Sequence, residues 1–129
     1  MDLGNNNLHG TIPDELGKLK FLEVLYLDGN EITGSIPSEL GTLVSLESLS
    51  LSKNKLTGTI PRSLGQCSKL TEIFLGFNFF QGSIPPGLFR SKNIEKLNLA
   101  SNDLTGTIPS NIDQLKNLHE SKFLPNLNL

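Results

Sequence analysis

The sequence has one cysteine, Cys67, no tryptophan and no apolar run longer than a few residues. A single cysteine excludes an internal disulfide framework and any metal site built from several cysteines. The apolar runs are far shorter than the roughly 18 residues of a membrane-spanning helix. The opening residues MDLGNNNLHG also lack the apolar core of an export signal. The residues themselves therefore predict neither membrane insertion nor secretion of this chain.

An excess of charge of one sign is also missing. The chain carries 11 basic and 13 acidic residues, for a net charge of −2, and these are scattered along the sequence. Nucleic acids and anionic membranes are bound by clustered Lys and Arg, so we expect no nucleic-acid partner. Phosphate-binding loops and zinc-ligand spacings are absent from the sequence as well. We therefore expect no cofactor and no metal.

What the sequence does have is a repeat of 24 residues, marked by columns of asparagine, glycine and proline. A fixed period of this length is typical of solenoid proteins, in which each repeat packs only on its neighbours. We place five repeats in residues 1–118 and a degenerate sixth in residues 119–129. The columns are Asn6, Asn30, Asn54, Asn78, Asn102 and Asn126; Gly10, Gly34, Gly58, Gly82 and Gly106; Pro13, Pro37, Pro61, Pro85 and Pro109.

Each part of the repeat has a physical role. The alternation in Leu25-x-Leu27 and Leu49-x-Leu51 predicts a short strand with its leucines turned inward, and stacked repeats place these strands in parallel. The asparagine that follows the strand can hydrogen-bond backbone groups of neighbouring turns. Glycine then allows a tight bend, and proline fixes φ as the chain crosses to the other side. We predict an α/β solenoid with strands on a concave face and irregular or 3-10 turns on a convex face.

The repeated pattern LxxLxLxxNxLxGxIPxxLGxL resembles the plant-specific leucine-rich repeats of receptor-like kinase and receptor-like protein ectodomains. The resemblance covers residues 1–118. It implies an extracellular solenoid at the plasma membrane that binds a peptide, a microbial molecule or a co-receptor on its concave face. A membrane helix and a cytosolic serine/threonine kinase usually follow in this family. The chain has no cysteine-bearing cap before Met1, so we expect it to be a segment of a longer protein.

The residues that face outward from the expected strands are the candidate ligand-binding residues. Phe74 and Phe77 stand out because other repeats mostly have polar or small residues there, and Tyr26 lies two strands away. Aromatic side chains on an exposed surface are typical of binding sites, although packing of Phe74 on its neighbours is an equal alternative. For Phe79 we predict packing. The candidate set is Tyr26, Asp28, Ser50, Lys53, Glu72, Phe74, Phe77, Lys96 and Asn98.

No candidate catalytic site emerges, and we predict that the chain is not an enzyme. Glu23 and Glu47 share a column about 5 Å apart, which is the carboxylate spacing of a retaining glycosidase. An open face gives little desolvation to separate their pKa values, so a solvated surface is the better interpretation. His9 and His119 lie more than four repeats apart, too far to share a metal. Cys67 falls in a leucine column and is predicted to be a buried filler.

The hypotheses on function follow from the repeat and its outward columns. The first is a ligand-binding segment of a plant receptor ectodomain. The alternative is a secreted inhibitor of cell-wall-degrading enzymes, because similar short plant repeats serve in inhibitors of fungal pectinases. We also predict that exposed leucine layers at the ends of the stack favour self-association.

Overall fold

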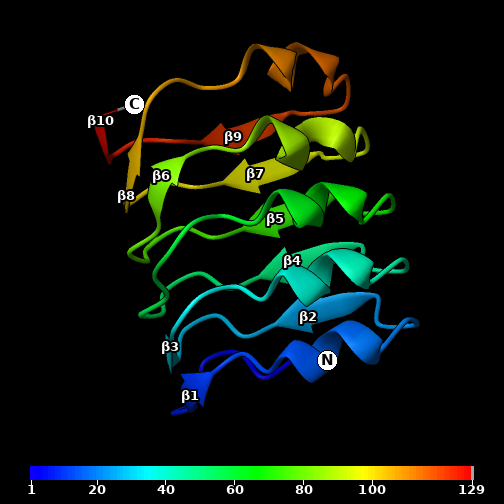
Figure 1. Ribbon diagram of the computed structural model, residues 1–129, viewed down its shortest axis with the longest axis vertical. Helices are drawn as coiled ribbons and strands as arrows, with labels where there is room; N and C mark the ends of the chain where they lie inside the picture. The colour runs from blue at the N-terminus through cyan, green and yellow to red at the C-terminus, as the bar shows by residue number, and fades with distance from the viewer. Residues whose placement is uncertain (129) are drawn as a thin grey trace.

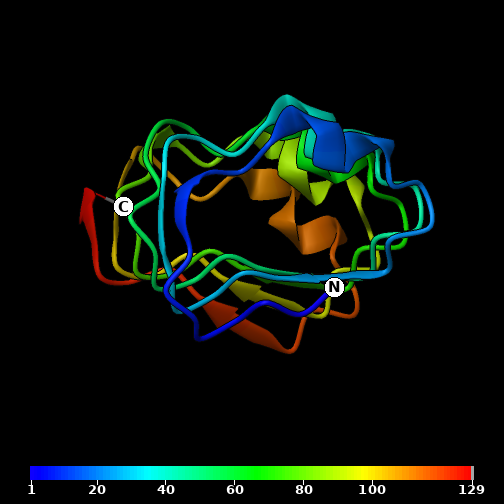
Figure 2. The same ribbon diagram turned by 90° about the horizontal axis from the view of Figure 1, so that it is seen from below.

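The computed structural model describes residues 1–128, which form a solenoid whose repeats stack along one axis (Figure 1). Seen along that axis, each repeat makes one turn of a ring, with strands on one side and short helices opposite (Figure 2). This arrangement confirms the predicted leucine-rich-repeat fold. No helix in the described part of the chain is long and apolar enough to cross a membrane.

A parallel sheet of five strands runs along one side of the solenoid in the order β2, β4, β5, β7, β9. The strands are β2 (Val24–Tyr26), β4 (Ser48–Ser50), β5 (Glu72–Phe74), β7 (Lys96–Asn98) and β9 (Glu120–Lys122). The first repeat joins the edge of this sheet through a bridge between Asp2 and Tyr26. We call the outward surface of this sheet and its following turns the sheet face. It corresponds to the concave face of the sequence analysis.

A second set of short parallel strands, which was not predicted from the sequence, begins at or just after the column asparagine in every repeat except the third. It comprises β1 (His9–Thr11), β3 (Glu31–Thr33), β6 (Gln81–Ser83), β8 (Asn102–Thr105) and β10 (Asn126–Asn128). Backbone hydrogen bonds from Lys55 to Ile32 (2.9 Å) and from Gln81 to Gly58 (2.8 Å) continue the pairing through the third repeat. These segments are three or four residues long, too short for an alternation to identify a strand in the sequence, and two of them contain a glycine with positive φ.

Five 3-10 helices form the opposite side of the ring, as the sequence analysis expected. They are η1 (Asp14–Lys18), η2 (Ser38–Thr42), η3 (Arg62–Gln66), η4 (Pro86–Arg90) and η5 (Ser110–Gln114). A proline of the repeated column stands directly before each helix, with φ fixed between −58° and −74°. Glycine in the helix allows close stacking, because a Cβ at Gly65 would overlap the backbone oxygen of Gly87 in the next repeat.

The hydrophobic core fills the ring between the sheet and the helices. The inward leucines of the strands, such as Leu25 and Leu49, are fully buried, as are Leu40 and Leu64 of the helices. Phe80 and Phe89 supply the largest fully buried side chains. Because every layer covers the next, burial of apolar surface depends on stacking and not on a single repeat.

The asparagine column lies buried at the turn after each strand and joins one repeat to the next. The Asn78 amide nitrogen donates to the carbonyl of Leu51 in the preceding repeat (2.9 Å) and to that of Leu75 in its own (3.2 Å). Its side-chain oxygen accepts a hydrogen bond from the backbone N–H of Leu56 (3.0 Å). Asn54 and Asn102 make the equivalent contacts. The predicted structural role of this column is confirmed.

Replacement of Asn78 by alanine is expected to lower the free energy of unfolding by roughly 3 kcal/mol, because buried backbone groups lose their partners. Urea denaturation followed by circular dichroism measures this change. The exposed Gln81→Ala substitution is the matched control and should change stability little. A loss for Asn78→Ala no larger than that of the control would contradict the assigned role.

Candidate functional site

The strand register aligns the candidate residues in columns across the sheet face. Tyr26 lies beside Ser50, Ser50 beside Phe74, and Phe74 beside Asn98. A second column contains Glu72 beside Lys96. The alignment follows from the 24-residue period, because each residue stands next to its equivalent one repeat away. The period therefore decides which side chains are neighbours on this face.

A shallow hollow of about 330 Å³ on the sheet face brings together four of the predicted residues. Tyr26, Asp28, Ser50 and Phe74 line it. Tyr26 and Phe74 are half-buried, so their rings form part of the surface without being covered by neighbours. The hollow is thus a place where an apolar group and a polar group of a ligand can be in contact with the protein together.

The first repeat completes this hollow with Asp2 and Asn5, which were not among the candidate residues. Asp2 belongs to the same column as Tyr26 and is bridged to it. Asn5 belongs to the column of Lys53 and Phe77, and like them it has a positive φ. The signal that could have identified both residues was their position in these columns. The hollow draws its lining from four consecutive repeats.

Glu72 and Lys96 form an ion pair in the neighbouring column of the sheet face. Their Oε1 and Nζ atoms are 2.7 Å apart, and the Ser48 hydroxyl donates to Glu72 Oε2 at 2.9 Å. The hydrogen bond from Lys96 holds the pKa of the Glu72 carboxyl below its usual range, with Ser48 acting in the same direction. The pair bridges two strands and presents fixed charges of both signs beside the hollow.

The remaining candidates lie around the hollow and do not line it. Lys53 and Phe77 adopt positive φ values of 55° and 58° at the turn after their strands. Phe77 is 53% exposed. Asn98 uses its side-chain oxygen to accept a hydrogen bond from the N–H of Ala100 (3.1 Å). The candidate residues therefore fall into three groups: those that line the hollow, the Glu72–Lys96 ion pair, and those that lie around the hollow.

The prediction that Phe79 packs on its neighbours is wrong. Its side chain is 52% exposed, and the adjacent Phe80 is fully buried in the core. The cause is the alternation that begins at the buried Asn78: when Phe80 points inward, Phe79 must point outward. Phe77 and Phe79 consequently form two exposed rings on either side of Asn78.

The groups considered for catalysis lie in separate surroundings. Glu23 and Glu47 are both exposed. Cys67 is fully buried, as predicted, and burial raises the pKa of its thiol to about 11. The thiol donates to the carbonyl of Leu40 at 3.3 Å. Such a thiol is largely protonated at neutral pH and is a poor nucleophile. Residues 1–128 contain no cluster of three or more side chains suited to a metal.

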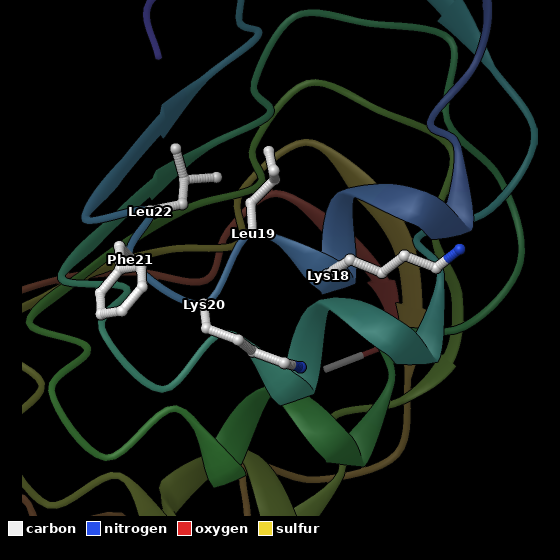
Figure 3. Close-up of a pocket in the computed structure, with 5 residues that line it drawn as sticks. All are labelled: Lys18, Leu19, Lys20, Phe21 and Leu22. Carbon is white, nitrogen blue, oxygen red and sulfur yellow. The ribbon is translucent and has the colours of Figure 1, made fainter.

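Another surface hollow lies at the first repeat, away from the sheet face (Figure 3). It is lined by Lys18, Leu19, Lys20, Phe21 and Leu22. The Phe21 side chain is 93% exposed, and the Lys20 ammonium donates to the carbonyl of Gly17 at 2.7 Å. This apolar surface belongs to the first repeat, at one end of the stack. Self-association through this end stays a prediction.

The pKa of Glu72 is expected to rise towards its ordinary value when Lys96 is replaced by methionine. In the wild type, the folded-state pKa lies below the unfolded-state value. The carboxylate therefore stabilises the fold above the unfolded-state pKa, and this contribution is lost as pH falls through the folded-state pKa. An NMR titration of the Glu72 carboxyl carbon measures the pKa of Glu72 in the wild type and in the Lys96→Met variant. The control Lys53→Met should leave this titration unchanged; an equal shift in the two variants would contradict the assignment.

Comparison with known proteins agrees with this geometry. Leucine-rich-repeat family models match residues 22–80 and residues 1–19 and 93–115. The search of curated protein sequences found no match. Among solved structures, the chain is similar to the Arabidopsis receptor kinase HAESA, solved in complex with the peptide hormone IDA and the co-receptor SERK1. The TM-score is 0.95 and the identity 38%, over 98% of this chain and 21% of HAESA.

Two further structures are similar over nearly the whole chain. The leucine-rich-repeat ectodomain of the Arabidopsis thaliana receptor kinase SOBIR1 has a TM-score of 0.89 and 30% identity, over 95% of this chain and 66% of that one. A plant ice-binding protein has a TM-score of 0.91 and 34% identity, over 98% and 41%. The chain thus spans between about a fifth and two thirds of these structures. It belongs to the leucine-rich-repeat family and has the plant type of repeat found in receptor kinase ectodomains.

Proposed function

We propose that this chain is a ligand-binding segment of a plant receptor ectodomain, acting at the extracellular face of the plasma membrane. Its ligand is a peptide or a protein, bound on the sheet face. The similarity to HAESA, which was solved with a peptide hormone and a co-receptor, supports this proposal. The segment binds and does not catalyse, and any kinase activity belongs to a separate domain of a longer protein.

The observation that carries the proposal is the hollow around Tyr26 and Phe74. Two aromatic side chains remain half-exposed on a parallel sheet whose other side is fully packed. Aromatic residues in such hollows dominate the binding energy of many interfaces, because they bury a large area with little loss of conformational entropy. The fixed backbone of the stacked strands holds both rings in place before a ligand arrives, which lowers the entropic cost of binding.

The area of the sheet face limits the affinity of this chain. Five strands about 4.8 Å apart, each near 17 Å wide, give roughly 400 Å². A standard protein interface covers about 800 Å² on each partner. We therefore propose that the segment contributes part of a longer binding surface, and that peptides bind to the chain alone in the micromolar range or more weakly.

Peptides selected from a random phage-displayed library against the wild-type chain test the proposal. Their affinity, measured by isothermal titration calorimetry, should fall by about tenfold or more in the Tyr26→Ala and Phe74→Ala variants. Ser50→Tyr provides a variant that fills the hollow without removing a ring, and it should weaken binding as well. Lys69→Ala, an exposed change away from the sheet face, is the control. Equal affinities for all variants would overturn the proposal.

A second candidate function, ice binding, is favoured by a column of hydroxyl groups beside the second set of strands. The column is exposed and recurs in the first five repeats, and its hydroxyl groups make no hydrogen bond to protein within residues 1–128. It comprises Thr11, Ser35, Thr59, Ser83 and Thr107. A rigid row of hydroxyls spaced by about 4.8 Å can hold water in a regular array. The similarity to a plant ice-binding protein supports this candidate.

Inhibition of ice recrystallisation distinguishes the second candidate from the first. If the hydroxyl column binds ice, the wild-type chain should inhibit crystal growth, and Thr59→Glu should abolish the inhibition by interrupting the row. Ser50→Glu, the same introduced charge on the sheet face, should leave the inhibition intact. Failure of the wild-type chain to inhibit, or an equal loss in the two variants, would rule out this candidate.

A further inference from the structure

Two carboxylates converge on the same small space at one end of the hollow on the sheet face. The Asp28 Oδ1 atom lies 3.1 Å, and the Asp2 Oδ1 atom 3.4 Å, from the point where a Cβ would sit on Gly4. Asp2 also accepts a hydrogen bond from the Gly4 N–H at 3.1 Å. Both side chains line the hollow together with Tyr26 and Phe74.

No cation of the described residues neutralises this pair of carboxylates. The ion pairs of residues 1–128 are Lys55 with Glu31, Lys96 with Glu72, and Lys122 with Glu120. Two neighbouring carboxylates without a counter-charge among the described residues attract a positive group to the space between them.

The absence of a side chain at Gly4 leaves this space open. Gly4 has no positive φ, so its backbone does not require glycine. Other repeats carry Asp28, Ser52, Gly76 and Ala100 at the equivalent position, which shows that the column accepts side chains. Any Cβ at Gly4 would instead crowd the two carboxylate oxygens.

The aromatic side chain beside the two carboxylates favours the same kind of ligand group. Tyr26 is half-buried and pairs with Asp2, whereas Phe74 lies at the other end of the hollow, beyond Ser50. Aromatic rings attract cations, and a guanidinium group is both attracted to the ring and able to stack on it. Carboxylates bind the planar guanidinium through two directed hydrogen bonds, whereas an ammonium group is a more strongly hydrated point charge.

We propose that this end of the hollow is a subsite for a guanidinium group, supplied by an arginine side chain of the bound peptide. The inference rests on the proposed ligand-binding function and specifies the chemistry of the ligand. Asp2 and Asp28 bind the charge, Tyr26 in the adjacent column position contacts the plane of the group, and Gly4 provides the room. Residues 1–128 hold no group of three or more His, Cys, Asp or Glu side chains that could bind a metal ion, which favours an organic cation as the occupant.

The test uses N-acetyl-argininamide as the probe and the full 129-residue chain. Proton NMR of the Tyr26 ring should show saturable shifts on titration. The neutral analogue N-acetyl-citrullinamide has the same shape without the charge and should cause none. In Asp28→Asn the Kd should rise by about threefold or more, as expected for loss of a partly exposed ion pair. Gly4→Val should also weaken binding by occupying the space without changing the charge.

Glu47→Gln is the matched control, because it removes one exposed negative charge outside the hollow. It should leave the Kd of the arginine probe unchanged. Equal shifts with the arginine and citrulline probes, or equal weakening in Asp28→Asn and Glu47→Gln, would overturn the guanidinium subsite. If library peptides still lose affinity in Tyr26→Ala and Phe74→Ala while the arginine probe fails, the proposed function stands and only this inference falls.

Discussion

Hydrogen bonding by the buried asparagine column is the interaction on which the rest of the structure depends. Each side-chain amide nitrogen donates to carbonyl groups of two successive repeats, and the side-chain oxygen accepts a hydrogen bond from a backbone N–H of the preceding repeat. Without these bonds, the turn after each strand would bury backbone groups that have no partner. No buried side-chain nitrogen or oxygen lacks a partner in the described part of the chain. The column therefore fixes both the distance between repeats and the register in which they stack.

Fixed register is what turns separate repeats into a binding surface. The hollow takes Asp2 from the first repeat, Tyr26 and Asp28 from the second, Ser50 from the third and Phe74 from the fourth. None of these residues belongs to the repeated pattern, so they are free to differ while the leucines and asparagines remain the same. The scaffold and the ligand specificity are thus encoded by different positions of the same 24 residues. The proposed guanidinium subsite is formed by residues at these variable positions.

The sequence was sufficient to predict the fold, the columns of the sheet face and the burial of Cys67, because all three follow directly from the period. It was not sufficient for features that depend on neighbouring repeats. The second set of strands was missed because each strand is only three or four residues long, too short for an alternation to identify it. Phe79 was assigned to packing because its exposure depends on Phe80 entering the core. Asp2 and Asn5 were left out of the candidate set although they share columns with Tyr26 and Phe77, because only the stacked repeats show that they line one hollow with Tyr26.

Native-state hydrogen exchange of the backbone N–H groups that donate to the asparagines is the most direct test of whether this column couples the repeats. Those of Ile32, Leu56 and Phe80 lie in different repeats, each 3.0 Å from its asparagine oxygen. If the column couples the repeats into one unit, these N–H groups exchange only through global unfolding, and NMR gives the same opening free energy for each. Values that differ among the three by more than about 1 kcal/mol would mean that the repeats open independently, which would contradict the account.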